Sequence, residues 1–92
     1  MSNTRVPYLP RGVRRHHDAV RGAEVLLGPE RALMLDDIGH AILSEVDGVR
    51  SIHDLSADLA ARFDAPLEAI ASDVAEFLSN LADKRLIEFN DA

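Results

Sequence analysis

Residues 26–37, LLGPERALMLDD, decide the fold that the sequence predicts, because they hold a turn, a strand and a helix start in succession. Gly28-Pro29 predicts the turn, since Pro fixes φ and Gly adopts conformations that other residues avoid. The apolar run within residues 30–35 predicts a short strand. The acidic pair that follows predicts a helix N-terminus, where a carboxylate accepts hydrogen bonds from free backbone N–H groups.

The predicted strand is apolar on both faces. Successive side chains of a strand point to opposite sides, so Leu33 and Leu35 share one face while Ala32 and Met34 share the other. A strand with one face in water normally alternates apolar and polar residues. The sequence therefore indicates that both faces are covered, and it leaves open what covers the second one.

Two further strands are predicted before this turn, and their short connections favour an antiparallel meander. Residues 13–18 (VRRHHD) have the polar composition of an edge strand, and residues 23–27 (AEVLL) follow the turn residue Gly22. The strand over 30–35 is then the other outer strand of the sheet. Residues 1–12 contain Pro and Gly and lack periodicity, so we expect an irregular N-terminal arm.

Three helices are predicted after the strands. Asp36 or Asp37 caps the first, which Gly48 is expected to end. Residues 51–54 (SIHD) resemble a capping box that opens the second, and Pro66 suits the first turn of the third. Apolar residues at helical spacing mark the buried sides of these helices: Ile38, Ala41, Ile42, Leu43 and Val46 in the first, Ile52, Leu55, Leu59 and Phe63 in the second, and Leu67, Ile70, Val74, Phe77, Leu78 and Leu81 in the third.

Three strands followed by three helices is the order of a winged helix-turn-helix with the wing placed first. We therefore predict an α+β fold: winged helix-turn-helix-like, with an N-terminal three-stranded antiparallel sheet followed by three helices. A single domain is expected over residues 13–92. Residues 86–89 (LIEF) either form a last short strand or pack onto this domain.

Composition narrows the class of protein. A chain of 92 residues with 47% apolar residues is one soluble domain. No apolar run reaches the roughly 20 residues that span a bilayer. The start lacks the apolar core of a secretory signal, so we expect a cytoplasmic protein without membrane contact. Residues 1–31 carry six Arg against three acidic residues, whereas residues 32–92 carry four basic against thirteen acidic residues. This imbalance is either a solvated surface or a field that orients a charged partner.

Catalytic and metal-binding chemistry finds little support. His16 and His17 are adjacent on a predicted strand and face opposite sides, while His40 and His53 fall on different helices. The absence of Cys excludes disulfides and thiolate metal sites. Glycine-rich phosphate-binding and nucleophile-elbow motifs are missing. We expect no metal, no cofactor and no enzyme activity. An acyl carrier is disfavoured too, because no Asp-Ser-Leu attachment site occurs.

The alternative function is a DNA-binding transcription regulator, because winged helices commonly bind DNA. A recognition helix faces phosphates, so its exposed side is usually basic or polar. Residues 66–84 (PLEAIASDVAEFLSNLADK) instead carry four acidic residues against Lys84 alone. Basic residues of the wing would offset part of this repulsion. We therefore favour a protein that does not bind nucleic acid, and keep DNA binding as the alternative.

The chain resembles the family of coenzyme PQQ synthesis protein D. The resemblance runs from Pro10 over nearly the whole chain and rests on residues 21–63 (RGAEVLLGPERALMLDDIGHAILSEVDGVRSIHDLSADLAARF) followed by residues 70–81 (IASDVAEFLSNL). Two departures are visible. Asp36 stands where the family often has Asn, and residues 84–85 (KR) stand where it often has Gly.

This resemblance implies a peptide chaperone, the recognition element of a ribosomally made and modified peptide. Such a protein binds the precursor peptide of pyrroloquinoline quinone. It presents that peptide to a radical S-adenosylmethionine enzyme, which cross-links a Glu and a Tyr within it. The family has no catalytic residues of its own, and some members are fused to another enzyme of the pathway. We expect a monomer, in which the peptide occupies the edge that would otherwise pair with a second copy.

A candidate binding site follows from the resemblance together with the unusual strand. The peptide would add as an extended strand along residues 31–35. One face of that strand would join the core, while the other would line a groove that the third helix closes, with Met34 and Phe77 as apolar contacts. The expected peptide-binding residues are Arg31, Ala32, Leu33, Met34, Leu35, Asp73, Glu76, Phe77, Asn80 and Leu81. The alternative is that the helices and the N-terminal arm cover both faces of the strand.

A chaperone also needs a surface for its enzyme. Arg11, Arg14 and Arg15 are candidates, because long-range attraction speeds encounter. Ordinary solvated arginines explain the same pattern equally well.

Overall fold

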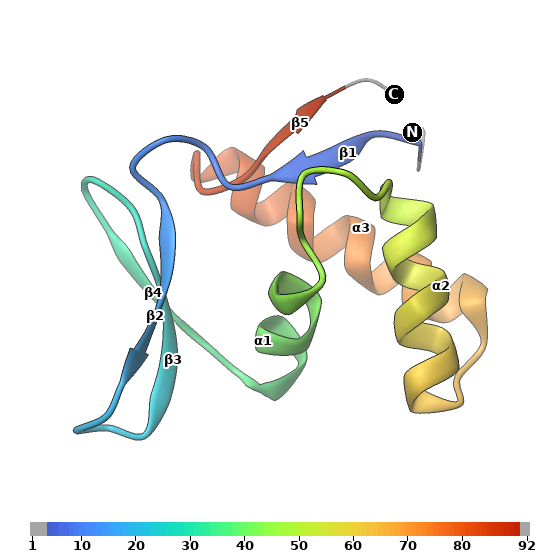
Figure 1. Ribbon diagram of the computed structural model, residues 1–92, viewed down its shortest axis with the longest axis horizontal. Helices are drawn as coiled ribbons and strands as arrows, with labels where there is room; N and C mark the ends of the chain where they lie inside the picture. Colours follow the sequence, from blue (N-terminus) through green and yellow to red (C-terminus); the bar gives the residue numbers. More distant parts are fainter. Residues whose placement is uncertain (1–3, 91–92) are drawn as a thin grey trace.

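The computed structural model describes residues 4–90, which fold into two antiparallel sheets and three helices (Figure 1). The larger sheet has the strand order β2-β3-β4. Its strands and the helices that follow are β2 (Arg14–Asp18), β3 (Ala23–Leu27), β4 (Ala32–Leu35), α1 (Asp37–Ser44), α2 (Ile52–Phe63) and α3 (Leu67–Asp83). The predicted α+β fold, an antiparallel three-stranded sheet followed by three helices, is therefore confirmed.

The second sheet was not predicted. Strand β1 (Val6–Tyr8) pairs antiparallel with strand β5 (Glu88–Asn90), so the expectation of an irregular arm over residues 1–12 is wrong for residues 6–8. Residues 1–3 lie outside the described residues. The expectation failed because β1 has only three residues, one of them Pro, and its pairing partner lies about 80 residues away along the chain. A segment this short carries no periodicity that reveals a distant partner.

Side-chain contacts hold the two termini together at this sheet. The Tyr8 hydroxyl donates a hydrogen bond of 2.9 Å to Glu88 Oε1. Because that carboxylate accepts the phenolic hydrogen, the pKa of Tyr8 lies above its ordinary value. The Arg5 guanidinium lies 4.1 Å from the centre of the Phe89 ring, a cation–π geometry. Of the two alternatives for residues 86–89, a short strand is present as β5, one or two residues further on, while Leu86 and Ile87 before it pack into the core.

The helix starts agree with the sequence. The Asp36 carboxylate accepts a hydrogen bond of 2.7 Å from the backbone N–H of Gly39, and the Ser51 hydroxyl oxygen accepts one of 3.1 Å from that of Asp54. These bonds satisfy N–H groups that have no partner within the helix. Pro66 occupies the capping position of α3 rather than its first turn.

Gly48 does not end α1, contrary to the sequence prediction. The helix stops at Ser44, and Gly48 adopts a φ of 76° four residues later. The reason is a separate turn in the connection to α2. In that turn the Asp47 carboxylate accepts hydrogen bonds of 2.9 Å from the backbone N–H groups of Val49 and Arg50.

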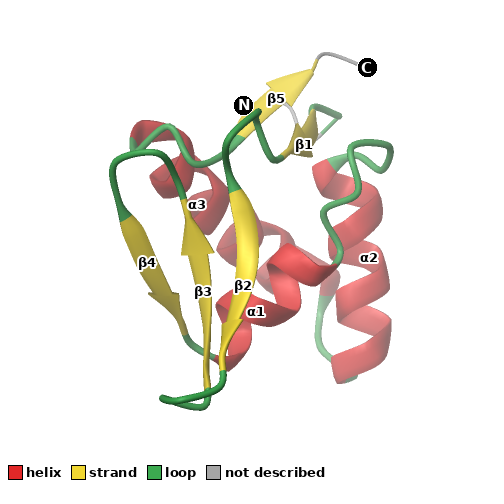
Figure 2. Ribbon diagram, turned by 60° about the vertical axis from the view of Figure 1, so that its left-hand side comes forward, coloured by secondary structure: helices red, strands yellow, loops and turns green. Residues whose placement is uncertain are grey.

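The core lies between one face of the larger sheet and the three helices. Leu26 of β3, Leu43 of α1, Leu55 of α2 and Leu78 of α3 are at most 1% exposed. Burying one such side chain stabilises the fold by roughly 1.5–3 kcal/mol. In Figure 2 helices α1 and α3 lie behind the sheet, α2 lies to its right, and β4 forms its left-hand edge. None of the helices within residues 4–90 combines the length and the apolar character that crossing a membrane requires.

Candidate functional site

Strand β4 forms an open edge of the larger sheet. It pairs with β3 on one side, and within residues 4–90 no strand pairs with its other side. Exposed edges are usually blunted by charge or Pro, as in β2 at the opposite edge, which reads RRHHD. The β4 sequence, ALML, contains neither. A further extended chain would therefore meet no charged or Pro residue on this strand.

The hydrogen-bond pattern identifies which residues face the open edge. Gly28 N–H donates to the carbonyl of Arg31 at 2.8 Å, so these opposed residues are a hydrogen-bonded pair. Hydrogen-bonded and non-bonded pairs alternate along antiparallel strands. From the register Leu27↔Ala32 and Leu26↔Leu33, Leu33 bonds to β3. The N–H and C=O groups of Ala32 and Met34 therefore point to the open side of β4.

The two faces of β4 differ in burial. Leu33 lies opposite Leu26, which is fully buried, and cross-strand partners share a face. Leu33 and Leu35 are half-buried and pack against the core. Met34 is 56% exposed on the other face, where its sulfur accepts a long hydrogen bond of 3.9 Å from Arg21. One face therefore joins the core as predicted, whereas the alternative that the helices and the N-terminal arm cover both faces is wrong at Met34.

One side of α3 carries Phe77 in a row of polar residues. Asp73, Phe77, Asn80 and Lys84 follow each other at intervals of four, three and four residues, which places them on one side of a helix; we call this set the α3 stripe. Phe77 is half-buried and the other three are exposed. The Phe77 ring packs on Gly39 of α1, where a Cβ atom would lie 3.1 Å from its Cζ atom. Only Gly leaves room for this contact without a shift.

The structure separates Met34 from Phe77, so the expected groove between them is wrong. Phe77 packs against the same core as Leu33 and Leu35, and α3 lies behind the sheet in Figure 2. Met34 points to the opposite face, because it follows Leu33 directly in the strand. Leu81 is 2% exposed and belongs to the core, so its side chain is not accessible from outside. Glu76 is exposed, one residue before Phe77.

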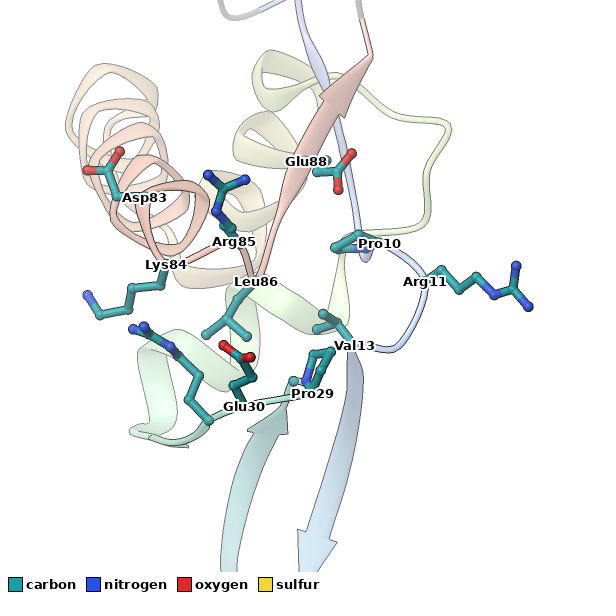
Figure 3. A pocket seen from close by; sticks show the side chains of 12 residues that line it. Pro10, Arg11, Val13, Pro29, Glu30, Asp83, Lys84, Arg85, Leu86 and Glu88 are labelled. Carbon is teal, nitrogen blue, oxygen red and sulfur yellow. The ribbon is translucent and has the colours of Figure 1, made fainter.

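A hollow of about 350 Å³ lies at the Arg31 end of β4, between the β3–β4 turn and the end of α3 (Figure 3). Residues 28–31 and 83–86 form most of its lining. A Cβ atom on Gly28 would lie 2.7 Å from Leu86 Cδ2, so any larger residue here would force the Leu86 side chain to shift. Arg85 adopts a φ of 61°, in the left-handed region that favours Gly. The chain thus turns at Arg85, directly after α3.

A second hollow, of about 240 Å³, lies at the other end of the α3 stripe, and we call it the helix hollow. Its lining includes Ile38 and Ile42 of α1, Leu59 and Phe63 of α2, and Ile70 and Asp73 of α3. Sequence reasoning missed it. Ile38 and Phe63 were assigned to the buried sides of their helices, yet they are 68% and 55% exposed. Among the residues described, no group of three or more His or acidic side chains is placed to hold a metal ion.

Comparison with known proteins decides the family. The sequence model of the family Coenzyme PQQ synthesis protein D (PqqD) matches residues 24–87. The chain belongs to the PqqD family. A PqqA binding protein of Rhizobium meliloti (strain 1021) is 49% identical to it over 88 residues, which cover 96% of this chain and 90% of that protein. The bifunctional coenzyme PQQ synthesis protein C/D of Methylorubrum extorquens is 42% identical over 87 residues and is much longer, since the match covers 23% of it.

Solved PqqD structures share the fold. The solution NMR structure of the PqqD truncation of Methylobacterium extorquens PqqCD superimposes with a TM-score of 0.82 at 42% identity, covering 95% of this chain and 93% of that one. That truncation is described as a functional, stand-alone recognition element for ribosomally synthesised and modified peptides. TbiB1, solved in complex with the TbiA(beta) leader peptide, has a TM-score of 0.75 at 23% identity and covers 88% of this chain and 94% of its own. This last likeness extends to the fold alone.

Proposed function

We propose that this PqqD-family chain is an accessory protein of pyrroloquinoline quinone synthesis that binds the PqqA precursor peptide as an added strand along β4. It then presents the peptide to a radical S-adenosylmethionine enzyme and has no catalytic role itself. The observation that carries the proposal is the open main chain of Ala32 and Met34 on an uncharged edge strand. Strand addition draws affinity from main-chain hydrogen bonds and specificity from alternate side chains.

The relatives support this function. The Rhizobium meliloti relative is named for binding PqqA, and the PqqD truncation is a recognition element on its own. A chain of this size and fold is therefore sufficient for recognition in a protein 42% identical to it. The TbiB1 complex provides a further example of the fold with a leader peptide bound.

The side chains beside the edge suggest how the peptide is read. We propose that peptide side chains on the core side of the added strand contact the α3 stripe, while those on the other side lie near Ala32 and Met34. We propose no direct peptide contact for Leu33, Leu35 and Leu81. They pack in or against the core and hold β4 and α3 in place. Of the residues expected from the sequence, we propose direct peptide contacts for Arg31, Ala32, Met34, Asp73, Glu76, Phe77 and Asn80.

The electrostatics of α3 argue against the DNA-binding alternative. Its exposed residues include Asp73, Glu76 and Asp83, and the exposed cations Lys84 and Arg85 follow its last residue. Each carboxylate near a phosphate backbone would weaken binding, because affinity for DNA depends on neutralising phosphates. The backbone of a bound peptide is uncharged, so these carboxylates do not repel it. We therefore propose no second function.

A proline substitution on the open edge tests the proposal. Met34→Pro removes an N–H that faces the open side, and Pro is tolerated on edge strands. Met34→Ala, the matched control, removes the side chain and keeps the N–H. In titrations of isotope-labelled protein with a synthetic PqqA peptide, we expect amide shifts in residues 30–36 and along the α3 stripe. Met34→Pro should weaken binding about tenfold, since it removes a main-chain hydrogen bond and perturbs the neighbouring ones.

Two results would reject strand addition. One is equal affinity of folded Met34→Pro and wild-type protein. The other is an equal loss in Met34→Pro and Met34→Ala, which would assign the effect to the side chain. Presentation is measured separately, as the rate at which the radical enzyme cross-links PqqA with and without this chain. An unchanged rate would remove that part of the proposal.

A further inference from the structure

The helix hollow leaves large apolar side chains in contact with water. Ile38 and Phe63 are 68% and 55% exposed, and Leu59 and Val74, at 2% and 1% exposed, also line it. Asp73 is the one charged residue in the lining. Small soluble proteins rarely keep an apolar depression with such a lining unless something docks there.

The hollow lies close to the end of β4 along the chain. Ile38 is three residues beyond Leu35, the last residue of β4, and Asp73 belongs to the α3 stripe together with Phe77. An extended chain advances about 3.3 Å per residue. Because Ile38 follows Leu35 by three residues, their Cα atoms are at most about 10 Å apart. A peptide paired with β4 that continues past Leu35 toward α1 spans this distance with about three or four residues.

The charges around the hollow further define its occupant. Asp73 lines it, while Asp37 and Asp64 adjoin Ile38 and Phe63 in the chain, and all three acidic residues are exposed. None of them forms an ion pair with another described residue. The guanidinium of Arg62 also lies at the rim, 5.2 Å from the centre of the Phe63 ring, and it donates a hydrogen bond of 3.1 Å to Glu45 Oε1. Because Glu45 compensates that charge, the three unpaired carboxylates leave the rim acidic on balance, which complements a basic residue on the occupant.

We propose that the helix hollow takes one large apolar side chain of the bound peptide, flanked in the peptide by a Lys or Arg, from the segment just beyond the residues that pair with β4. This inference rests on the proposed function and adds a second recognition point to it. The edge would bind main chain of many sequences, whereas the hollow selects one apolar side chain. An anchor of this kind in an apolar pocket commonly dominates the affinity of a peptide.

Two variants test the hollow without removing a core side chain. Ala41→Leu fills the space from α1, and Ile38→Ser removes apolar area at the mouth. Val49→Ser, the matched control, replaces another exposed apolar residue (77%, against 68% for Ile38) in the connection between α1 and α2, outside the hollow. With a synthetic PqqA peptide in calorimetry, we expect both hollow variants to bind about tenfold more weakly and the control to bind like wild type.

A double-mutant cycle with the peptide identifies the anchor. Each apolar residue of PqqA is replaced by Ala in turn. One replacement should weaken binding to the wild-type protein about tenfold and cause little further loss with Ala41→Leu, because the two changes remove the same contact. If the protein change and the peptide change weaken binding independently, so that their losses in binding free energy add, the assignment is wrong. Replacing the neighbouring basic residue of the peptide by Gln should weaken binding to wild type, and less so to Asp73→Asn.

The outcomes separate this inference from the proposed function. If Met34→Pro loses affinity while Ala41→Leu and Ile38→Ser do not, the peptide uses the edge alone and the hollow assignment is wrong. If wild-type protein does not bind PqqA, the proposed function fails and the inference fails with it. If the protein self-associates and Ile38→Ser abolishes this without changing peptide affinity, the occupant is a second copy of the chain.

Discussion

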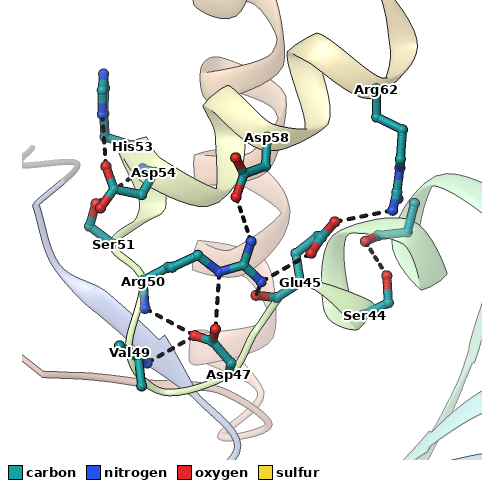
Figure 4. Close-up of polar contacts among 11 residues, drawn as sticks. Ser44, Glu45, Asp47, Val49, Arg50, Ser51, His53, Asp54, Asp58 and Arg62 are labelled. Carbon is teal, nitrogen blue, oxygen red and sulfur yellow. Dashed lines mark hydrogen bonds and ion pairs between the residues drawn. The ribbon is translucent and has the colours of Figure 1, made fainter.

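The Arg50 guanidinium donates a hydrogen bond of 2.6 Å to Asp58 Oδ2, which ties the α1–α2 connection to the outer side of α2 (Figure 4). The same guanidinium reaches Asp47 at 3.0 Å and both the carbonyl and the carboxylate of Glu45, at 2.7 and 3.0 Å. One side chain therefore joins α1, the connection and α2. These bonds hold the pKa of Arg50 above its ordinary value, because all its partners favour the charged form.

Replacing Arg50 should destabilise the protein. Arg50→Ala is expected to lower the free energy of unfolding by about 1–3 kcal/mol, since several charge-assisted hydrogen bonds are lost from a side chain that is partly screened by water. Arg50→Lys should recover less than half of this, because an ammonium cannot match the planar fork. Urea denaturation measures both. Arg14→Ala, an exposed arginine on β2, is the control and should change stability by less than about 0.5 kcal/mol.

Asp47 should make stability depend on pH in the acid range. Hydrogen bonds from the backbone N–H of Arg50, then of Val49, lower the pKa of Asp47 from 3.8 to about 2. A group whose folded pKa lies below its unfolded pKa stabilises the fold above about pH 4, and this contribution disappears as the pH falls through about 2. Wild type should therefore be more stable than Asp47→Asn near pH 6, and the difference should vanish toward pH 2. A difference that stays constant across this range would contradict the assignment.

Arg85 is a site where a substitution should stabilise the chain. Its φ of 61° strains any residue that has a Cβ atom. Arg85→Gly should raise the free energy of unfolding by about 0.5–1 kcal/mol, the relief of strain less the extra entropy of an unfolded Gly. Arg85→Ala keeps the strain and serves as the control. Equal stability of the Gly and Ala variants would show that the strain is absent in solution.

Gly28 should tolerate no larger residue while Leu86 is present. A Cβ atom at Gly28 would lie 2.7 Å from Leu86 Cδ2, so Gly28→Ala should cost about 1–3 kcal/mol through overpacking. Leu86→Ala alone should cost about 2–5 kcal/mol, because Leu86 is 1% exposed. The double variant should cost clearly less than the sum, since the second change removes the clash. Thermal unfolding of the three variants measures these costs. If the cost of the double variant equals the sum of the two single costs, Gly28 and Leu86 do not restrict each other.

The candidate site shows where sequence reasoning ends. Alternation along β4 correctly separated Leu33 and Leu35 from Ala32 and Met34, because side-chain parity is a local property of a strand. It did not reveal that Met34 and Phe77 lie on different sides of the sheet, since that depends on where α3 packs. Nor did it reveal that Ala32 and Met34, rather than Leu33, present their N–H groups to the open edge. That depends on the register with β3.

What the sequence by itself determined are features with local causes: a cap at Asp36 or Asp37, the cap at Ser51, the turn at Gly28 and the succession of β2, β3, β4 and the three helices. What only the tertiary structure decided are features made by distant residues. The β1–β5 pair joins the two termini, and the helix hollow forms where three helices leave Ile38 and Phe63 exposed. The helical spacing predicts that both residues are buried, because it identifies the apolar face of each helix. It does not show whether another part of the chain packs against that face.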